Sequence, residues 1–527
     1  MKKRLFAMFL ALAMALSLMP AALAAEEPGD EPQNSVEEPQ NQGPETPSEG
    51  NTTYVAEVNG QRYETLQKAI DTVTGAATIK LLDNIVAKKD EIVTIPAGKT
   101  VTLDMAGKSI TVESDFMGRP IVNEGTLTVT GNGTIDASAS ENGLGAINNK
   151  NTLTIDNGTY RGAVYASGSG IRNTGASAVL VIEDGVFEEA TCAVYNEGTA
   201  TIKDGTFSNR SCSACAKADG HEGMWSYVIR NATADSKMTI DGGTFTGIQG
   251  AASAAIGSLT VNDGYFKTVD CDKNHGAIFY ALYAAGEVGE VETVINGGTF
   301  ETEGKYTAVL IGNDNENGDG GINAQSAAEI RGGTFKAPRG VPAVKKEVET
   351  GQLSIIGGEF SSDPSQFVPD SHLVAKQGDK WIVGTQEDLA VAQFGDRKFA
   401  SLADAVAAVH EESDDSRMKE HVIELLRSVD GGGFAVGYQS ISNSNGNITT
   451  SGNSPVNITI DLGGNKYTVN PPSVGSSGTE TNGFQFLKGS FVKICNGSME
   501  LKSGVKCAYL FQNYANLTLE NVKVDIS

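Results

Sequence analysis

The sequence predicts an all-β chain wound into a parallel β-helix, and repetition is the main reason. A short phrase, in which a polar residue, a glycine and one variable residue precede an aromatic, occurs eight times between Asp156 and Phe360. Copies that recur every ~20 to 40 residues are typical of a solenoid, in which each repeat forms one coil. The composition agrees, because 62 glycines against two tryptophans suit a turn-rich β protein.

The first 25 residues are predicted to be a secretory signal peptide. Lys2, Lys3 and Arg4 form the charged start, an apolar run follows, and Ala22 to Ala24 provide the small residues of a cleavage site. The alternative is a membrane anchor, but the run is short and no second apolar span follows. We therefore expect an exported bacterial protein, secreted or held at the cell surface.

Residues 26–53 are predicted to be a disordered spacer. Positions 26–50 carry eight acids, no bases and several prolines, so the segment lacks the apolar surface that would offset its ordering entropy. The whole chain has a formal net charge of -25, which disfavours nucleic acid and anionic membranes as partners. The charge also weighs against a polyanionic substrate, unless calcium bridges the like charges.

Each coil is predicted to contain three short strands and three turns. A corner such as IVNEG at Ile121 precedes an alternating strand such as LTV at Leu127, and the glycine-aromatic phrase closes the coil. Apolar residues at period two indicate strands with one buried face, and Gly and Asn at fixed offsets indicate corners. The phrase aromatics are predicted to form a core stack rather than a sugar platform. The corner asparagines are predicted to form an interior ladder: Asn123, Asn148, Asn173 and Asn196.

This consensus resembles the right-handed parallel β-helix of the pectate-lyase-like superfamily, and most of all secreted bacterial surface proteins with GGTF repeats. The resemblance covers nearly all of residues 54–527. It implies the architecture but no single activity, because the superfamily holds lyases, hydrolases, adhesins and inert scaffolds.

A second level of repetition predicts two tandem β-helices, residues 54–385 and 386–527. Each copy has a strand, a glycine turn, and a short amphipathic helix that opens at Thr65 or Ser401. The end of a solenoid needs a cap, and this helix is expected to supply it. The first copy is expected to close with a hairpin within residues 359–384. The second is expected to be incomplete at Ser527, in a chain that continues.

The catalytic residues known from the superfamily do not carry over to this chain. Lyases on this fold use a carboxylate cluster for calcium with an Arg or Lys base, and hydrolases use Asp residues grouped on adjacent coils. Arg119 and Arg339 have no clustered acids at matching positions. Asp104 and Asp461 occupy the same place in both copies, which favours a shared structural role. No catalytic residue is therefore assigned.

The cysteines are predicted to form disulfides, as is usual in exported proteins. Cys192 and Cys212 each follow a phrase aromatic by five residues in consecutive repeats, so we expect them to stack and pair. Cys215 is expected to pair with Cys271. A zinc site, or a redox use of the Cys212 and Cys215 pair, is the weaker alternative. The sequence assigns no partner to Cys495 and Cys507, the other two cysteines.

One glycine-rich insertion, residues 312–321, is a partial match to a calcium loop. Its candidate ligands are Asp314, Glu316 and Asp319, but Asn313 replaces the opening Asp and Ala324 the bidentate Glu. A polar insertion without a metal is the favoured interpretation. The sequence thus predicts no cofactor, with calcium as the one cation to be tested.

Two longer insertions are the candidate recognition loops. They leave the coil just after a phrase aromatic, at residues 208–227 and 267–287, and are expected to project from the same side with one coil between them. The alternative is that their aromatics fold back over their own loops. The candidate ligand-binding residues are His221, Trp225, His275, Phe279, Tyr280 and Tyr283.

The sequence favours a non-catalytic secreted or cell-surface β-helix protein, adhesin-like or glycan-binding. Its partner would be a polysaccharide, a host or cell-surface glycan, or a protein. The alternative is a polysaccharide lyase or glycoside hydrolase that acts on a polymeric carbohydrate, with or without calcium. Two or three acids that converge on one face would favour the enzyme.

Overall fold

The computed structural model describes residues 53–526, except 163–167, 210–226, 249, 255, 272–279, 285–289, 313–324, 348–349, 413, 443–447 and 476–480. Thr53–Ser527 form one compact unit. Most of the described residues lie in strands, and the chain is a parallel β-helix, as predicted. The described helices all fall short of the length and apolar content that a membrane span requires.

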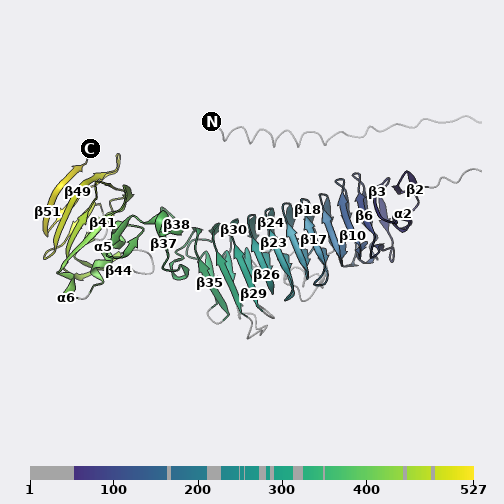
Figure 1. Cartoon of the computed structure of the whole chain (residues 1–527), viewed down its shortest axis with the longest axis horizontal. Helices are drawn as coiled ribbons and strands as arrows, with labels where there is room; N and C mark the ends of the chain where they lie inside the picture. The colour runs from purple at the N-terminus through teal and green to yellow at the C-terminus, as the bar shows by residue number, and fades with distance from the viewer. Residues whose placement is uncertain are drawn as a thin grey trace, which may run out of the picture. The chain divides into compact units, whose positions relative to one another are not determined.

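The first β-helix is built from three long sheets, and each coil contributes one strand to each sheet, so that the coils stack (Figure 1). Sheet A contains β1 (Ala56–Val58), β2 (Gln61–Tyr63), β3 (Ala76–Leu81), β6 (Thr100–Asp104), β10 (Thr126–Thr130), β14 (Thr152–Ile155), β17 (Val179–Ile182), β20 (Thr199–Ile202), β23 (Lys237–Ile240), β26 (Gly257–Val261), β29 (Val291–Ile295), β32 (Ser326–Ile330) and β35 (Gly351–Ile355). Sheet B contains β4 (Ile85–Ala87), β7 (Ser109–Val112), β11 (Thr134–Asp136), β15 (Thr159–Arg161), β18 (Val186–Glu188), β21 (Thr206–Ser208), β24 (Thr244–Ile248), β27 (Tyr265–Val269), β30 (Thr299–Thr302), β33 (Thr334–Lys336), β36 (Gly358–Phe360), β37 (His372–Gln377) and β38 (Lys380–Thr385). Sheet C contains β5 (Val93–Ile95), β9 (Ile121–Asn123), β13 (Ile147–Asn149), β16 (Ser169–Asn173), β19 (Cys192–Asn196), β22 (Tyr227–Asn231), β25 (Gly250–Ala254), β28 (Leu282–Ala284), β31 (Val309–Ile311) and β34 (Val344–Lys346). A short bridge joins β8 (Met117–Gly118) to β12 (Asn142–Gly143).

The phrase aromatics form one continuous stack inside the first β-helix, as predicted. Its eight rings are fully buried, and neighbouring ring centroids lie 4.6 to 5.1 Å apart. The glycine of each phrase makes this stack compact. At Gly205 the backbone has φ +129°, and an added Cβ would lie 2.9 Å from the carbonyl oxygen of Gly185 in the coil below. The members of the stack are Tyr160, Phe187, Phe207, Phe245, Phe266, Phe300, Phe335 and Phe360.

An interior asparagine ladder runs along sheet C, but one predicted member is wrong. The Nδ2 groups of Asn123, Asn149, Asn173 and Asn196 each donate to the Oδ1 of the next asparagine, at 2.7 to 2.8 Å, and Asn231 ends the series. Asn148 instead lies on the outer side and accepts a hydrogen bond from Thr174 Oγ1. The strand register aligns Asn149 with Asn123 and Asn173. Because side chains alternate between the two faces of a strand, the adjacent Asn148 lies on the outer face.

A helix and a hairpin close the two ends of the first β-helix. Helix α2 (Leu66–Thr72) begins at the predicted cap Thr65, whose Oγ1 accepts from the Lys68 backbone N–H. Lys99 Nζ donates to three carbonyls near the end of α2, each at 2.8 Å, which is the favourable place for a cation on a helix. At the other end the 3-10 turn η2 (Ser365–Phe367) leads to the expected hairpin of β37 and β38.

Residues 392–525 repeat the plan with their own hydrophobic core. Sheet E contains β39 (Ala392–Phe394), β40 (Arg397–Phe399), β41 (Glu420–Leu425), β42 (Val429–Gly431), β46 (Asn457–Asp461), β47 (Lys466–Val469), β49 (Phe491–Leu501) and β51 (Asn516–Asp525). Smaller sheets contain β43 (Phe434–Val436), β48 (Phe484–Phe486) and β50 (Phe511–Asn513), and the pair β44 (Tyr438–Ser442) and β45 (Ile448–Asn453). The helices are α4 (Gln386–Leu389), α5 (Leu402–His410) and α6 (Asp414–Arg417).

The two copies share local devices that the sequence comparison predicted. Ser401 caps α5 by accepting from the Asp404 backbone N–H at 3.0 Å, and the Asp404 carboxylate accepts from Ser401 Oγ at 2.6 Å. Asp104 and Asp461 both accept a backbone N–H two residues ahead, at 2.9 Å in each case. The equivalent aspartates therefore support turns, which is the structural role that was expected.

The predicted pair of Cys192 and Cys212 is not present, because Cys192 carries a free thiol. Cys215, the predicted partner of Cys271, lies outside the described residues, as does Cys212. The strand that follows β19 in sheet C is β22, which pairs Val194 with Ile229. The neighbours of β19 on this side therefore come from after the insertion at residues 208–227. The strands that flank β19 in sheet C are therefore β16 and β22, and neither contains Cys212.

The Cys192 thiol is expected to resist alkylation in the folded chain. Burial raises its pKa to about 12, so the reactive thiolate is scarce at pH 8. Iodoacetamide labelling followed by peptide mass spectrometry should modify the half-buried Cys507 first and Cys192 only after unfolding. A peptide that joins Cys192 to Cys212 in the unreduced protein would contradict the free thiol.

The buried His410 at the end of α5 is expected to make the second β-helix less stable in acid. Its Nδ1 bonds the Val406 carbonyl and its Nε2 accepts the Gly437 N–H, both at 2.9 Å. Both nitrogens of the neutral ring therefore have hydrogen-bond partners. Burial lowers the pKa of His410 below its usual value of 6.5, and the Arg417 charge adds to this effect. The unfolded chain therefore binds the proton more readily, and stability falls as the pH drops from ~6.5 toward the folded pKa.

Thermal unfolding of the full chain between pH 8 and pH 5 measures this effect. In H410Q, an amide oxygen can accept from Gly437 without titrating, so the pH dependence should be weaker than in the parent chain. H421Q is the matched control, because His421 is half-buried and its Nε2 bonds the Ser416 carbonyl. An H410Q profile that parallels the parent profile would contradict the role of His410.

Candidate functional site

Segments between strands, several of them long, lead into and out of sheet C. Residues 209–226 and 270–281 connect sheet B to sheet C, and residues 285–290 and 312–325 connect sheet C to sheet A. The first two start from β21 and β27, which are separated in sheet B by β24 alone. The expected spacing of one coil between these insertions therefore holds for the strands that carry them.

The outer side of sheet C carries an arginine and tyrosine column between these segments. The register places Arg172, Tyr195 and Arg230 on three successive strands, about 4.8 Å apart. The Arg172 guanidinium lies 4.9 Å from the centre of the Tyr195 ring, and its Nη2 lies 2.5 Å from Glu197. All three column residues are half-buried. The column therefore places a half-buried phenol ring between two half-buried guanidinium groups on the outer side of sheet C.

A buried arginine adds positive charge beneath this column. Arg119 is 5% exposed, and its Nη2 donates to Ser169 Oγ at 2.8 Å. Burial, followed by the charge of Arg172, lowers the pKa of Arg119 to about 9. Arg119 and Arg172 are therefore close enough to influence each other, and the Glu197 carboxylate partly offsets their charge.

Two of the predicted ligand-binding residues are buried. Tyr280 is 5% exposed and Tyr283 is 4% exposed, and they pack with Tyr227 and Tyr306 in a satellite cluster outside the main core. Gly250 makes room for this cluster, because an added Cβ would lie 2.2 Å from the Tyr227 ring. Tyr280 and Tyr283 therefore fold back onto the coil, which was the alternative to an exposed patch.

The remaining predicted site residues lie outside the described residues. They are His221, Trp225, His275 and Phe279 for ligand binding, Asp314, Glu316 and Asp319 for calcium, and Cys212 and Cys215 for disulfides. Within the described ranges, no group of three His, Cys, Asp or Glu side chains is placed to hold a metal ion.

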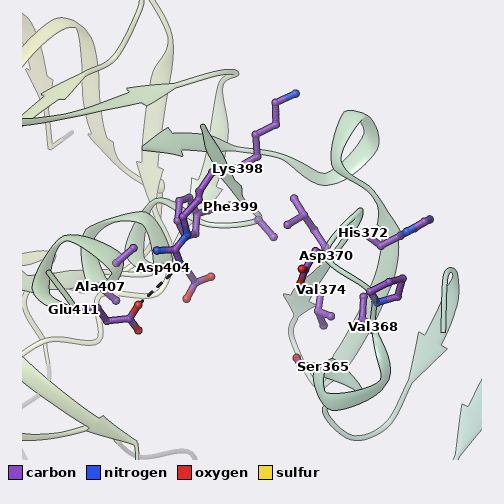
Figure 2. Close-up of a pocket in the computed structure, with 15 residues that line it drawn as sticks. Ser365, Val368, Asp370, His372, Val374, Lys398, Phe399, Asp404, Ala407 and Glu411 are labelled. Carbon is purple, nitrogen blue, oxygen red and sulfur yellow. Dashed lines mark ion pairs between the residues drawn. The ribbon is translucent and has the colours of Figure 1, made fainter. Parts of the chain in front are cut away.

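A cleft lies between the hairpin of β37 and β38 and the helix α5. This cleft has a volume of about 620 Å³, and Figure 2 shows side chains from both elements along it. Apolar residues line much of it: Val368, Pro369, Leu373, Val374, Phe399, Ala400, Ala407 and Ala408. The charged residues that line it are Asp370, Arg397, Lys398, Asp404 and Glu411, together with His372.

Several polar groups in the cleft already have partners. Glu411 and Arg397 form an exposed ion pair at 3.9 Å, drawn as a dashed line in Figure 2. The Arg397 guanidinium lies 5.0 Å from the centre of the Phe399 ring. Asp404 is engaged with Ser401 in the helix cap. The face of Phe399 under Arg397 is therefore covered, and the two carboxylates on the helix side have structural partners.

The sequence contained a signal for the column but none for the cleft. The column residues Arg172, Tyr195 and Arg230 directly precede the ladder members Asn173, Asn196 and Asn231. The same outer position holds Val122 and Asn148 in the two earlier coils. The cleft joins residues from two different β-helical copies, and neither copy shows a pattern that points to it.

No protein-family model, no curated protein and no solved structure matches this chain.

Proposed function

We propose that this protein is a non-catalytic, secreted or cell-surface β-helix protein that binds glycans, an adhesin-like scaffold of the pectate-lyase-like superfamily with GGTF repeats. The arginine and tyrosine column on sheet C carries this proposal. A phenol ring and guanidinium groups supply the apolar edge and the charge-assisted donors that sugar hydroxyls and carboxylates need. The stacked coils hold these groups at fixed spacing, which suits a polymeric ligand.

The proposed partner is a polysaccharide, or a host or cell-surface glycan or glycoprotein. The eight-ring stack and the asparagine ladder make the scaffold rigid, so the column is ordered before a ligand arrives, and less entropy is lost on binding. The export signal and the acidic spacer are consistent with display outside the cell. The partner classes that the net charge disfavours, nucleic acid and membrane surfaces, stay outside the proposal.

A glycan array probed with the full chain tests this function. We expect Y195A to weaken binding to any glycan that the parent protein binds, by about tenfold, which corresponds to ~1.4 kcal/mol. R172A and R230A should weaken it as well. T201A is the matched control, because Thr201 lies on the outer side of sheet A in the same coil. Equal binding by Y195A and T201A would overturn the assignment of the column.

A polysaccharide hydrolase is the alternative, and one observation favours it. Asp370, Asp404 and Glu411 line the same cleft, and carboxylate groups that converge on a sugar are the usual machinery of glycoside hydrolysis. Against it, Asp404 and Glu411 are already engaged with Ser401 and Arg397. If the cleft hydrolyses a glycan, E411Q should remove the activity and Y195A should leave the turnover number unchanged.

A further inference from the structure

Two strands with unpaired edges line the cleft between the hairpin and α5. β37 is the outermost strand of sheet B, and β40 is the outermost strand of sheet E. His372, Leu373 and Val374 line the cleft from β37, and Arg397 to Phe399 line it from β40. In the described part of the chain, the outer edge of each strand has no strand partner. Such edges present rows of backbone N–H and C=O groups that can pair with another chain.

From this geometry we propose that the cleft binds an extended polypeptide segment of another protein, which adds as a strand to one of these edges. Strand addition takes its affinity from main-chain hydrogen bonds and its specificity from alternate side chains. The cleft can supply both, because strands with unpaired edges line it together with apolar side chains, Val374 on the hairpin side and Ala407 on the helix side (Figure 2). Its volume of about 620 Å³ is within the ~300 to 1,000 Å³ range of ligand sites.

The strand edges suit a peptide ligand, because the backbone of an added strand can satisfy its N–H and C=O groups at such an edge. The exposed ion pair of Arg397 and Glu411, at 3.9 Å, contributes little to stability and is easily exchanged for contacts with a ligand.

The charges of the cleft select a basic segment. Three carboxylates line it, Asp370, Asp404 and Glu411, against the two cations Arg397 and Lys398. Asp404 lies in the first turn of α5 and Glu411 directly follows its last residue, so the two are roughly 10 Å apart along the helix axis. The net charge of -25 also attracts a cationic partner over a longer range. The expected ligand alternates apolar residues with Lys or Arg.

Selection from a phage-displayed library of random twelve-residue peptides tests this site. The full chain is the bait, and the E411K variant is used for counter-selection. Glu411 is 72% exposed, so the substitution should leave the fold intact. We expect enriched peptides with alternating apolar and basic residues. Each should bind E411K about tenfold more weakly than the parent chain, whereas E412K, with the same charge change at the neighbouring residue, should bind as the parent does.

Backbone methylation separates strand addition from simple charge attraction. The enriched peptides are resynthesised with N-methyl groups on alternate residues, in each of the two registers. One register should lose at least about tenfold in affinity and the other should lose little, because only one edge of an added strand pairs. Equal effects in both registers, no enriched peptide, or equal binding by E411K and E412K would each overturn the proposal. The binding of glycans at sheet C should be unchanged in E411K.

Discussion

Replacement of Phe245 by alanine is expected to lower the free energy of unfolding by about 3 to 5 kcal/mol. The side chain is fully buried between Phe207 and Phe266, with ring centroids 4.7 and 4.6 Å away. Its removal leaves a cavity that the neighbouring rings cannot fill, because each is held in its own coil by backbone pairing. Denaturant unfolding of the full chain, followed by circular dichroism, measures the loss.

T244A provides the matched control for this substitution. Thr244 directly precedes Phe245 in β24, but its side chain is exposed on the outer side of sheet B. We expect T244A to change the unfolding free energy by less than ~0.5 kcal/mol, as is usual for surface positions. A loss below about 1 kcal/mol in F245A would mean that the aromatic stack does not hold the coils together.

Replacement of Asn149 by alanine is expected to cost about 2 to 4 kcal/mol, because several buried groups lose a partner at once. Asn149 Nδ2 donates to Asn173 Oδ1 at 2.7 Å and to the Val179 carbonyl at 2.9 Å. Asn149 Oδ1 accepts from Asn123 Nδ2 at 2.8 Å. The same unfolding measurement applies, and hydrogen exchange should be faster in β9 and β16 than in distant coils.

N148A is an unusually close control for the ladder. Asn148 has the same side chain and the neighbouring position in the same strand, but it lies on the outer side and bonds Thr174 Oγ1. Its loss should cost no more than about 1 kcal/mol. If N148A proved as destabilising as N149A, the inward position of Asn149 would be wrong.

The coil could be predicted from the sequence because identical positions repeat in identical environments. A core aromatic followed by an alternating strand specifies both the buried face and the register, and the observed pairing of Phe207 with Phe245 follows from it. The ladder was predicted one residue off at Asn148 because two asparagines are adjacent there. Only the strand register decides which of the two points inward.

The strand that lies beside Cys192 and the burial of Tyr280 and Tyr283 could not be predicted, because both involve the insertions rather than the repeated coil. Equal spacing suggested that Cys192 and Cys212 stack, but the insertion places β22 over β19 instead. Tyr280 and Tyr283 were candidate ligand residues, and their burial depends on the space that Gly250 leaves beside Tyr227. The repeat consensus contains no information on either outcome.

The cleft was not predictable because its two sides belong to different repeat copies. Its residues on β37, β40 and α5 share no periodicity, and they come together only in the folded chain. By contrast, the arginine and tyrosine column could be found in the repeat alignment, at the positions directly before Asn173, Asn196 and Asn231.

Turnover on the glycans that the protein binds tests the central proposal most directly. The full chain is incubated with each bound polysaccharide, with and without calcium, and both new reducing ends and unsaturated uronide products are followed. We expect binding that depends on Tyr195, and no product on any polymer. Product formation that is lost in E411Q would contradict a non-catalytic function and would assign the cleft to hydrolysis.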